Sequence, residues 1–218
     1  MGLNYLRKHK RKKTLFGIIG IIVIPLYSYL LSRYGPGGDL ILVTFSQIGS
    51  RYGAIENLII WGLLSSFYYF LLLDYLFYLN GSKSKILRLT LAFSTLSMMF
   101  TVFLPFAPSM FPIASEVHNT LAYITAVAIL LTLFLYVMTY WHRDKTLFYW
   151  SMGILIVVIG ILIVILVIYG VSSLFQILLS SLLCYFLYLQ LILLERSDKI
   201  NIYEVLKKDD ELSDSDFY

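Results

Sequence analysis

The stretch SMGILIVVIGILIVILVIYG, residues 151–170, contains no charged side chain and decides the fold class. A helix needs roughly 20 consecutive, mostly apolar residues to cross the hydrocarbon core of a bilayer, and this stretch alone is long enough. A helix with so few polar groups has little to contribute to chemistry. We therefore expect it to be the most lipid-exposed helix or a purely packing element.

Five further apolar runs accompany this stretch. Hydrophobic residues make up 59% of the 218-residue chain and charged residues 14%, with a mean hydropathy of +0.80, which is far from the mixture found in soluble domains. The sequence therefore predicts an all-α, polytopic integral membrane protein, a six-transmembrane-helix bundle. We place its helices at about residues 15–32, 58–79, 87–105, 119–141, 147–169 and 173–194.

The Lys and Arg side chains predict how the bundle is oriented. With the N-terminus in the cytoplasm, 15 of the 17 basic residues lie on the cytoplasmic side and only Arg33 and Arg51 lie outside. This alternation is the bias that the positive-inside rule describes. We expect cytoplasmic N and C termini and a multi-pass location in the prokaryotic cytoplasmic membrane. The pI near 9.0 then reflects topology, and no nucleic-acid partner is expected.

Three regions lie outside the transmembrane domain, which we place at residues 15–194. Residues 1–14 form a basic cytoplasmic N-tail. Residues 33–57 form an outer loop whose apolar part is too short to span and is typical of an interfacial or re-entrant segment. Residues 195–218 form an acidic cytoplasmic tail with a composition typical of disorder. Within the first helix, Pro25 predicts a kink.

Asp74 is the clearest ionisable residue inside a predicted span, which makes it a functional hypothesis by default. It lies roughly 8 Å below the inner boundary, from the rise per residue of a helix, and Arg88 in the next helix is at a similar depth. One interpretation is an intramembrane polar pair, Asp74 with Arg88, that ties the second helix to the third. The other is a proton or cation relay, and both stay open.

The stretch PFAPSMFPIASEVHNTLAY, residues 105–123, separates the third helix from the fourth. Proline lacks the N–H donor and clashes with the preceding turn, so Pro105 and Pro108 end the third helix. Ser115 is the predicted N-cap of the fourth helix, and Glu116 then lies in its first turn, where a negative charge interacts favourably with the helix dipole. Much of the stretch is explained by these helix boundaries.

Helix boundaries do not explain His118 and Asn119, which fall at the outer water–lipid boundary. Other polar residues face the same leaflet, and together they predict a ligand-binding site that we call the outer polar cup. An interfacial histidine that caps its own helix or bonds Glu56 is an equal alternative for His118. The cup consists of Asp39, Arg51, Glu56, Glu116, His118 and Asn119.

The sequence offers no complete catalytic constellation, so we lean against an enzyme. A hydrolytic zinc site needs three protein ligands, and His118 is the only outer histidine. Ser115 or Ser46 would supply the serine of a Ser-His-Asp arrangement, but neither lies in a G-x-S-x-G context. Cys184 is the only cysteine, which excludes an intrachain disulfide. We expect neither a metal nor a cofactor.

A spaced motif joins Pro105, Phe111, Pro112, His118, Asn119 and Ala122. Together with SRYGPGGDLILVTFSQIG and GAIENLIIWGLL, it resembles a family of six-helix prokaryotic membrane proteins with no assigned activity. That family is distantly similar to the DRAM/Sfk/Frag-type membrane proteins, which are linked to membrane-lipid handling. The resemblance covers roughly residues 14–194 and implies the six-helix fold. It marks the outer FP…HN segment as the family's characteristic motif.

Three functions follow from these expectations. The first is a non-enzymatic protein that binds a membrane lipid or small amphiphile in the outer polar cup, since apolar walls with a few convergent polar groups suit such a ligand. The second is a small transporter or substrate-binding transport subunit, with Asp74 as coupling group. The third is an accessory or immunity-type protein that binds a membrane protein partner.

Overall fold

The uncharged run at residues 151–170 forms most of helix α7 (Lys145–Tyr169), which ends at Gly170 with a positive φ of 65°. The computed structural model describes residues 4–197 and 200–206. Of the six spans, α7 has the smallest buried share, 22%. This confirms that the least polar run is the most lipid-exposed helix.

Within residues 4–197 and 200–206, six helices are long and apolar enough to cross a membrane. The predicted all-α, six-helix fold class is confirmed, and the protein is a multi-pass membrane protein. The spans are Leu6–Ser32, Ile55–Leu79 (α4), Lys85–Phe103 (α5), Pro112–Met138 (α6), Lys145–Tyr169 (α7) and Ser173–Glu195 (α8).

The first span is one long helical segment in three parts, α1 (Asn4–Gly17), the π-helix η1 (Ile18–Val23) and α2 (Ile24–Ser32). The π-helical segment ends at Val23, two residues before Pro25, whose ring and missing N–H disturb the α-helical hydrogen-bond ladder. The helix begins about a dozen residues earlier than expected. Lys and Arg are good helix formers, and most of the predicted N-tail is therefore helix.

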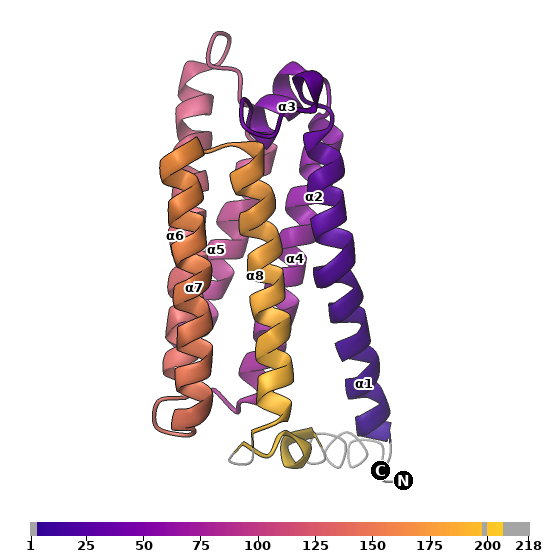
Figure 1. Cartoon of the computed structure of the whole chain (residues 1–218), viewed down its shortest axis with the longest axis vertical. Helices are drawn as coiled ribbons and strands as arrows, with labels where there is room; N and C mark the ends of the chain where they lie inside the picture. Colours follow the sequence, from indigo (N-terminus) through magenta and orange to yellow (C-terminus); the bar gives the residue numbers. More distant parts are fainter. Residues whose placement is uncertain (1–3, 198–199, 207–218) are drawn as a thin grey trace.

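Helix α8 lies at the centre of the arrangement. It contacts α1, η1, α2, α4 and α7, and half of its span is buried, as is half of α4. Figure 1 shows the long helices running side by side, and α3 (Phe45–Arg51) lying across one end of the bundle. Aromatic and aliphatic side chains fill the interior, with Phe77, Tyr136, Tyr140 and Phe186 among the largest that are fully buried.

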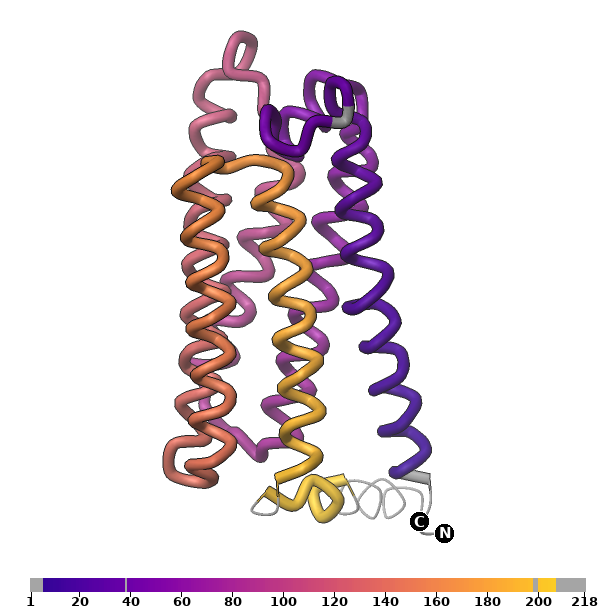
Figure 2. Tube along the Cα trace, in the orientation of Figure 1, coloured from indigo at the N-terminus to yellow at the C-terminus, as the bar shows by residue number. Residues whose placement is uncertain are grey.

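The two ends of the bundle differ in charge. The start of α1 and the end of α8 lie at one end (Figure 1), together with the connections at residues 80–84 and 139–144. We call this the basic end. The opposite end carries the 33–54 segment, which folds over the tops of the helices (Figure 2). We call it the α3 end.

The α3 end is held by local capping and by hydrogen bonds to α8. Thr44 and Gln47 form a reciprocal capping box at the start of α3. The Val43 carbonyl accepts bonds from the backbone N–H and hydroxyl of Ser173, both at 2.7 Å. The outer segment is therefore fixed to the start of α8.

The described part of the C-terminal tail packs against the basic end. Residues 202–206 are helical, and Ile200, Ile202 and Leu206 are buried in the main hydrophobic cluster. The predicted disordered tail thus begins, at residues 200–206, with an ordered segment. The acidic run at residues 207–218 lies outside the described residues.

Candidate functional site

A cavity of about 340 Å³ lies inside the half of the bundle next to the α3 end. Its walls come from α3, α4, α5, α6, α7 and α8, and they are mostly aliphatic and aromatic. Ligand pockets range from about 300 to 1,000 Å³ and combine apolar walls with a few polar groups. The polar groups nearest the α3 end are Thr44, Ser46, His118, Asn119 and Gln176.

Part of the cavity lining belongs to residues of α6 and α7 that are also exposed. Tyr123 and Val127 on α6 and Ile163 on α7 line it, yet their side chains are 62%, 67% and 54% exposed. In a membrane, this outer surface of the bundle faces lipid.

His118 joins three elements at the polar end of the cavity. Its side chain is 2% exposed. Its Nδ1 lies 3.0 Å from the carbonyl oxygen of Leu104, the C-cap residue of α5. Its Nε2 lies 2.7 Å from the Ser46 hydroxyl on α3. A carbonyl only accepts, so Nδ1–H donates to Leu104, and Nε2 of the neutral ring accepts from Ser46.

The position of Ser46 follows from the anchoring of the first turn of α3. The N–H of Phe45 donates to the Gln176 side-chain oxygen at 2.6 Å. The Phe45 ring is fully buried and meets Trp61 edge-on, with ring centroids 5.0 Å apart. Packing and hydrogen bonding on both sides therefore direct Ser46 toward His118.

A second set of polar contacts lies deeper, beside the cavity wall. The Trp61 indole N–H donates to the Ser28 hydroxyl at 2.8 Å, and the Tyr69 hydroxyl donates to the Ser180 carbonyl at 3.2 Å. Thr125 also lines the cavity, and its hydroxyl is buried with no hydrogen-bond partner among the described residues. Such an orphaned group is costly unless a ligand or water bonds it.

The structure divides the residues of the outer polar cup. His118 and Asn119 line the cavity. The other four are exposed charged residues that do not line it, although all lie at the α3 end. Asp39 accepts a hydrogen bond from the N–H of Ile41 at 2.8 Å. The four are Asp39, Arg51, Glu56 and Glu116.

Two predictions for this region are wrong: Ser115 does not cap the helix, and Glu116 does not lie in its first turn, which contains no acidic residue. Helix α6 begins at Pro112, with Phe111 as its N-cap residue, so the prediction that Ser115 caps the helix is wrong. Proline suits the first turn because its missing N–H would have no partner there. The Ser115 hydroxyl instead accepts a bond from the N–H of Ala107 at 3.0 Å, which fixes the loop before α6.

Asp74 and Arg88 lie on the bundle surface, where both side chains are exposed. The described residues include no ion pair between them. Neither side chain lines the cavity. The structure therefore does not bring together the two groups of the expected intramembrane pair.

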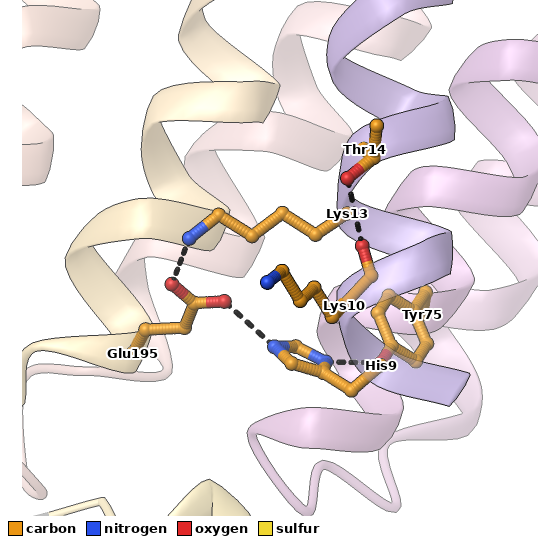
Figure 3. A network of polar contacts seen from close by, with 6 residues as sticks. All are labelled: His9, Lys10, Lys13, Thr14, Tyr75 and Glu195. Carbon is orange, nitrogen blue, oxygen red and sulfur yellow. Dashed lines mark hydrogen bonds and ion pairs between the residues drawn. The ribbon is translucent and has the colours of Figure 1, made fainter. Parts of the chain in front are cut away.

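A buried polar network occupies the basic end (Figure 3). His9 of α1 lies between Glu195 of α8, 2.6 Å from Nε2, and the Tyr75 hydroxyl of α4, 2.5 Å from Nδ1. Lys13 forms an ion pair with the other Glu195 oxygen, and Lys12 lies over the Tyr75 ring, 4.8 Å from its centroid. The network joins α1, α4 and α8.

The sequence did not predict this network because His9 and Lys13 lie in the predicted N-tail, residues 1–14, and Glu195 lies in the predicted C-terminal tail, residues 195–218. The available signal was Glu195, a single carboxylate directly after the apolar run LQLILL. A carboxylate at the end of a membrane span is usually paired with a basic side chain. The partners are Lys13 and His9 from the start of the chain, which no local pattern connects to Glu195.

The arrangement of groups limits the chemistry of the site. Among residues 4–197 and 200–206, no group of three His, Cys, Asp or Glu side chains is placed to hold a metal ion. The cavity offers an apolar volume, amide groups and a histidine at its α3 end, and Ser and Thr residues along its walls.

Comparisons with family models, with curated proteins and with solved structures gave no match to this chain.

Proposed function

We propose that this protein binds a lipid or another amphiphile with a single apolar chain in the cavity at the α3 end. One observation carries the proposal: an apolar cavity of about 340 Å³ has a histidine and two amide side chains at its α3 end. The polar residues elsewhere in its walls are Ser and Thr, whose hydroxyls, apart from that of Thr125, bond carbonyls of their own helices. An amphiphile has the same division, and the chain would lie between α5, α6 and α7. Its polar head would meet His118, Asn119 and Ser46.

The exposed cavity-lining residues of α6 and α7 support the same conclusion. The exposed lining residues Tyr123 and Val127 let a chain enter directly from the bilayer. A water-soluble ligand would gain nothing from a lipid-facing entrance.

The charge distribution supports placing this cavity in the outer leaflet. The basic residues of α1 and of the connections at residues 80–84 and 139–144 would lie on the cytoplasmic side. Both termini would then be cytoplasmic, and the α3 end would face outward. The prokaryotic cytoplasmic membrane is the location we propose on this basis. Membership of the six-helix FP…HN family is part of the same proposal.

No observation specifically supports the two alternatives, which are transport and the binding of a membrane protein partner. A coupling group for transport should face the substrate, whereas Asp74 is exposed on the bundle surface and lies outside the cavity lining. A protein partner would need a surface that distinguishes it from lipid. The amphiphile hypothesis uses the cavity directly, and we therefore prefer it.

The test is to identify what stays bound when the protein is purified in lipid nanodiscs, with an Ala126→Trp variant for comparison. Ala126 lines the cavity, so the indole should fill it and expel the ligand. Native mass spectrometry should show a stoichiometric amphiphile on the wild-type protein and less than about a tenth of it on the variant, the loss expected for roughly 1.4 kcal/mol of binding free energy.

Ile124→Trp is the matched control, because Ile124 lies on the same helix, is 39% exposed and does not line the cavity. It should retain the ligand. Equal amounts of the same bulk lipids on all three proteins would contradict the proposed function. Ala122→Phe provides a second filled cavity if Ala126→Trp does not fold.

A further inference from the structure

We propose that Ser46 and His118 act as a nucleophile and its general base in acyl transfer from an ester lipid bound in the cavity. This inference rests on the proposed function, because the cavity would hold the acyl chain that is transferred. The pair has the contact that such chemistry requires, since the Ser46 hydroxyl lies 2.7 Å from His118 Nε2.

The tautomer of His118 is the first argument. Nδ1 is committed as a donor to the Leu104 carbonyl, at 3.0 Å, so the lone pair of the neutral ring is on Nε2 and faces the serine proton. In serine hydrolases a carboxylate holds the histidine in this same orientation. In this protein the backbone carbonyl of Leu104, at the C-terminal end of α5, orients the histidine instead of a carboxylate.

The bonding of Ser46 is the second argument. Buried hydroxyls in this bundle mostly donate to a carbonyl three or four residues earlier in their own helix, as Ser28, Ser66 and Thr101 do. Such bonds satisfy a hydroxyl at little cost and are purely local. Ser46 instead bonds a ring nitrogen 72 residues away and lines the cavity.

The substrate class follows from what surrounds the pair. Aliphatic residues of α6 and α7 line the cavity beyond Ser46, which suits a fatty acyl chain. The Asn119 side chain lines the cavity and forms no hydrogen bond with any described residue. Its amide N–H is therefore available to the carbonyl oxygen of an ester, which gains negative charge in the tetrahedral intermediate.

The reaction balances with a lipid ester and water or a second alcohol. The Ser46 oxygen attacks the ester carbonyl while its proton passes to His118 Nε2. The C–O bond to the alcohol then breaks, and His118 returns the proton to the leaving alkoxide. Water or an acceptor alcohol attacks the acyl-serine in the same way, releasing a fatty acid or a new ester and restoring both residues.

Covalent labelling tests the pair directly. The full-length protein in nanodiscs is treated with an alkyl fluorophosphonate, and the modified peptide is located by mass spectrometry. We expect modification of Ser46, none in Ser46→Ala, and at least about a hundredfold slower labelling in His118→Asn, in line with loss of a general base. Ser50→Ala is the matched control, because Ser50 lies one turn along α3, is exposed, and should leave labelling unchanged.

Turnover of p-nitrophenyl esters of increasing chain length gives a second readout. Release of p-nitrophenol should rise with chain length, because the cavity binds the chain, and should be lost in Ser46→Ala. A purely structural role for the pair would lower thermal stability in both variants without any labelling of wild-type Ser46. That result, or wild-type turnover unchanged by Ser46→Ala, overturns the inference.

The two proposals fail in different ways. If an amphiphile is retained and is lost in Ala126→Trp, but Ser46 is not labelled, the protein binds lipid without acyl transfer. If Ser46 is labelled while no amphiphile is retained, Ser46 is a nucleophile and the proposal that the cavity stably binds an amphiphile is wrong. If neither is seen, both proposals are wrong.

Discussion

At the scale of single residues, position around a helix decides which polar groups reach the interior. Successive residues of a helix are about 100° apart, so Glu116 lies about 200° around α6 from His118. His118 is accordingly buried and Glu116 exposed. The sequence supported His118 and Asn119 as site residues, but it grouped them with charged neighbours that share only their end of the bundle.

The pairing of Ser46 with His118 could not be predicted for a related reason. The two residues are 72 positions apart, and no periodicity relates the rotation of α3 to that of α6. Their contact depends on the bonds of Val43 and Phe45 to α8. The sequence offers Ser46 as a candidate nucleophile, but no local motif supports it, because only the tertiary fold brings Ser46 to His118.

Glu195 provides the residue-scale prediction. Its carboxylate accepts from His9 and Lys13 at the basic end and its side chain is 14% exposed, so Glu195→Gln should lower the free energy of unfolding by about 1.5–3 kcal/mol, the range for bonds to a charged group. Thermal unfolding in detergent at pH 7 measures this change.

Glu204→Gln is the control, since Glu204 is exposed and forms no ion pair among the described residues. It should leave the unfolding temperature within error of the wild type. Equal unfolding temperatures for both variants would show that the network contributes nothing to stability.

At the scale of helices, the sequence predicted the six spans and most of their ends closely. The N-cap residues are Ser84 for α5, Asp144 for α7 and Ser172 for α8. Each side chain accepts a hydrogen bond from a backbone N–H in the first turn. The starts of the first helix and of α6 were the exceptions, because α6 begins at Pro112 and not at residue 119. Hydropathy locates the part of a helix that lies in lipid, and it does not register a polar helical extension such as residues 4–14.

Gly62 provides the prediction at this scale, because it lets α4 approach α5 closely. A Cβ atom at this position would lie 2.3 Å from Val102 Cγ1, so Gly62→Ala should destabilise the protein by about 1–3 kcal/mol through overpacking. The double variant Gly62→Ala, Val102→Ala removes the clashing methyl groups and should recover most of the loss in a thermal unfolding assay.

Gly160→Ala on α7 is the matched control, because a Cβ there meets no atom within 4 Å. It should be neutral or slightly stabilising, since Ala favours a helix over Gly. A loss in Gly160→Ala equal to that in Gly62→Ala would assign the effect to glycine flexibility rather than to helix contact.

At the scale of the whole molecule, the unequal ends predict a single orientation in the membrane. Cys184 is the only cysteine and is fully buried, so new cysteines can be placed on a Cys184→Ala background. With an outward α3 end, a membrane-impermeant maleimide added to intact cells should label Ser50→Cys and spare Ser82→Cys, which lies in the 80–84 connection. Both should react after permeabilisation, and labelling of Ser82→Cys in intact cells would reverse the topology.

Entry of the proposed ligand between α6 and α7 would change how occupancy of the cavity should be measured. A molecule that enters through Tyr123, Val127 and Ile163 arrives by diffusion in two dimensions, and its supply is set by its mole fraction in one leaflet. Diluting vesicles with buffer should then leave the bound fraction unchanged, whereas diluting the ligand with inert lipid should empty the cavity. For this protein, the bilayer acts as the reservoir from which the site is filled.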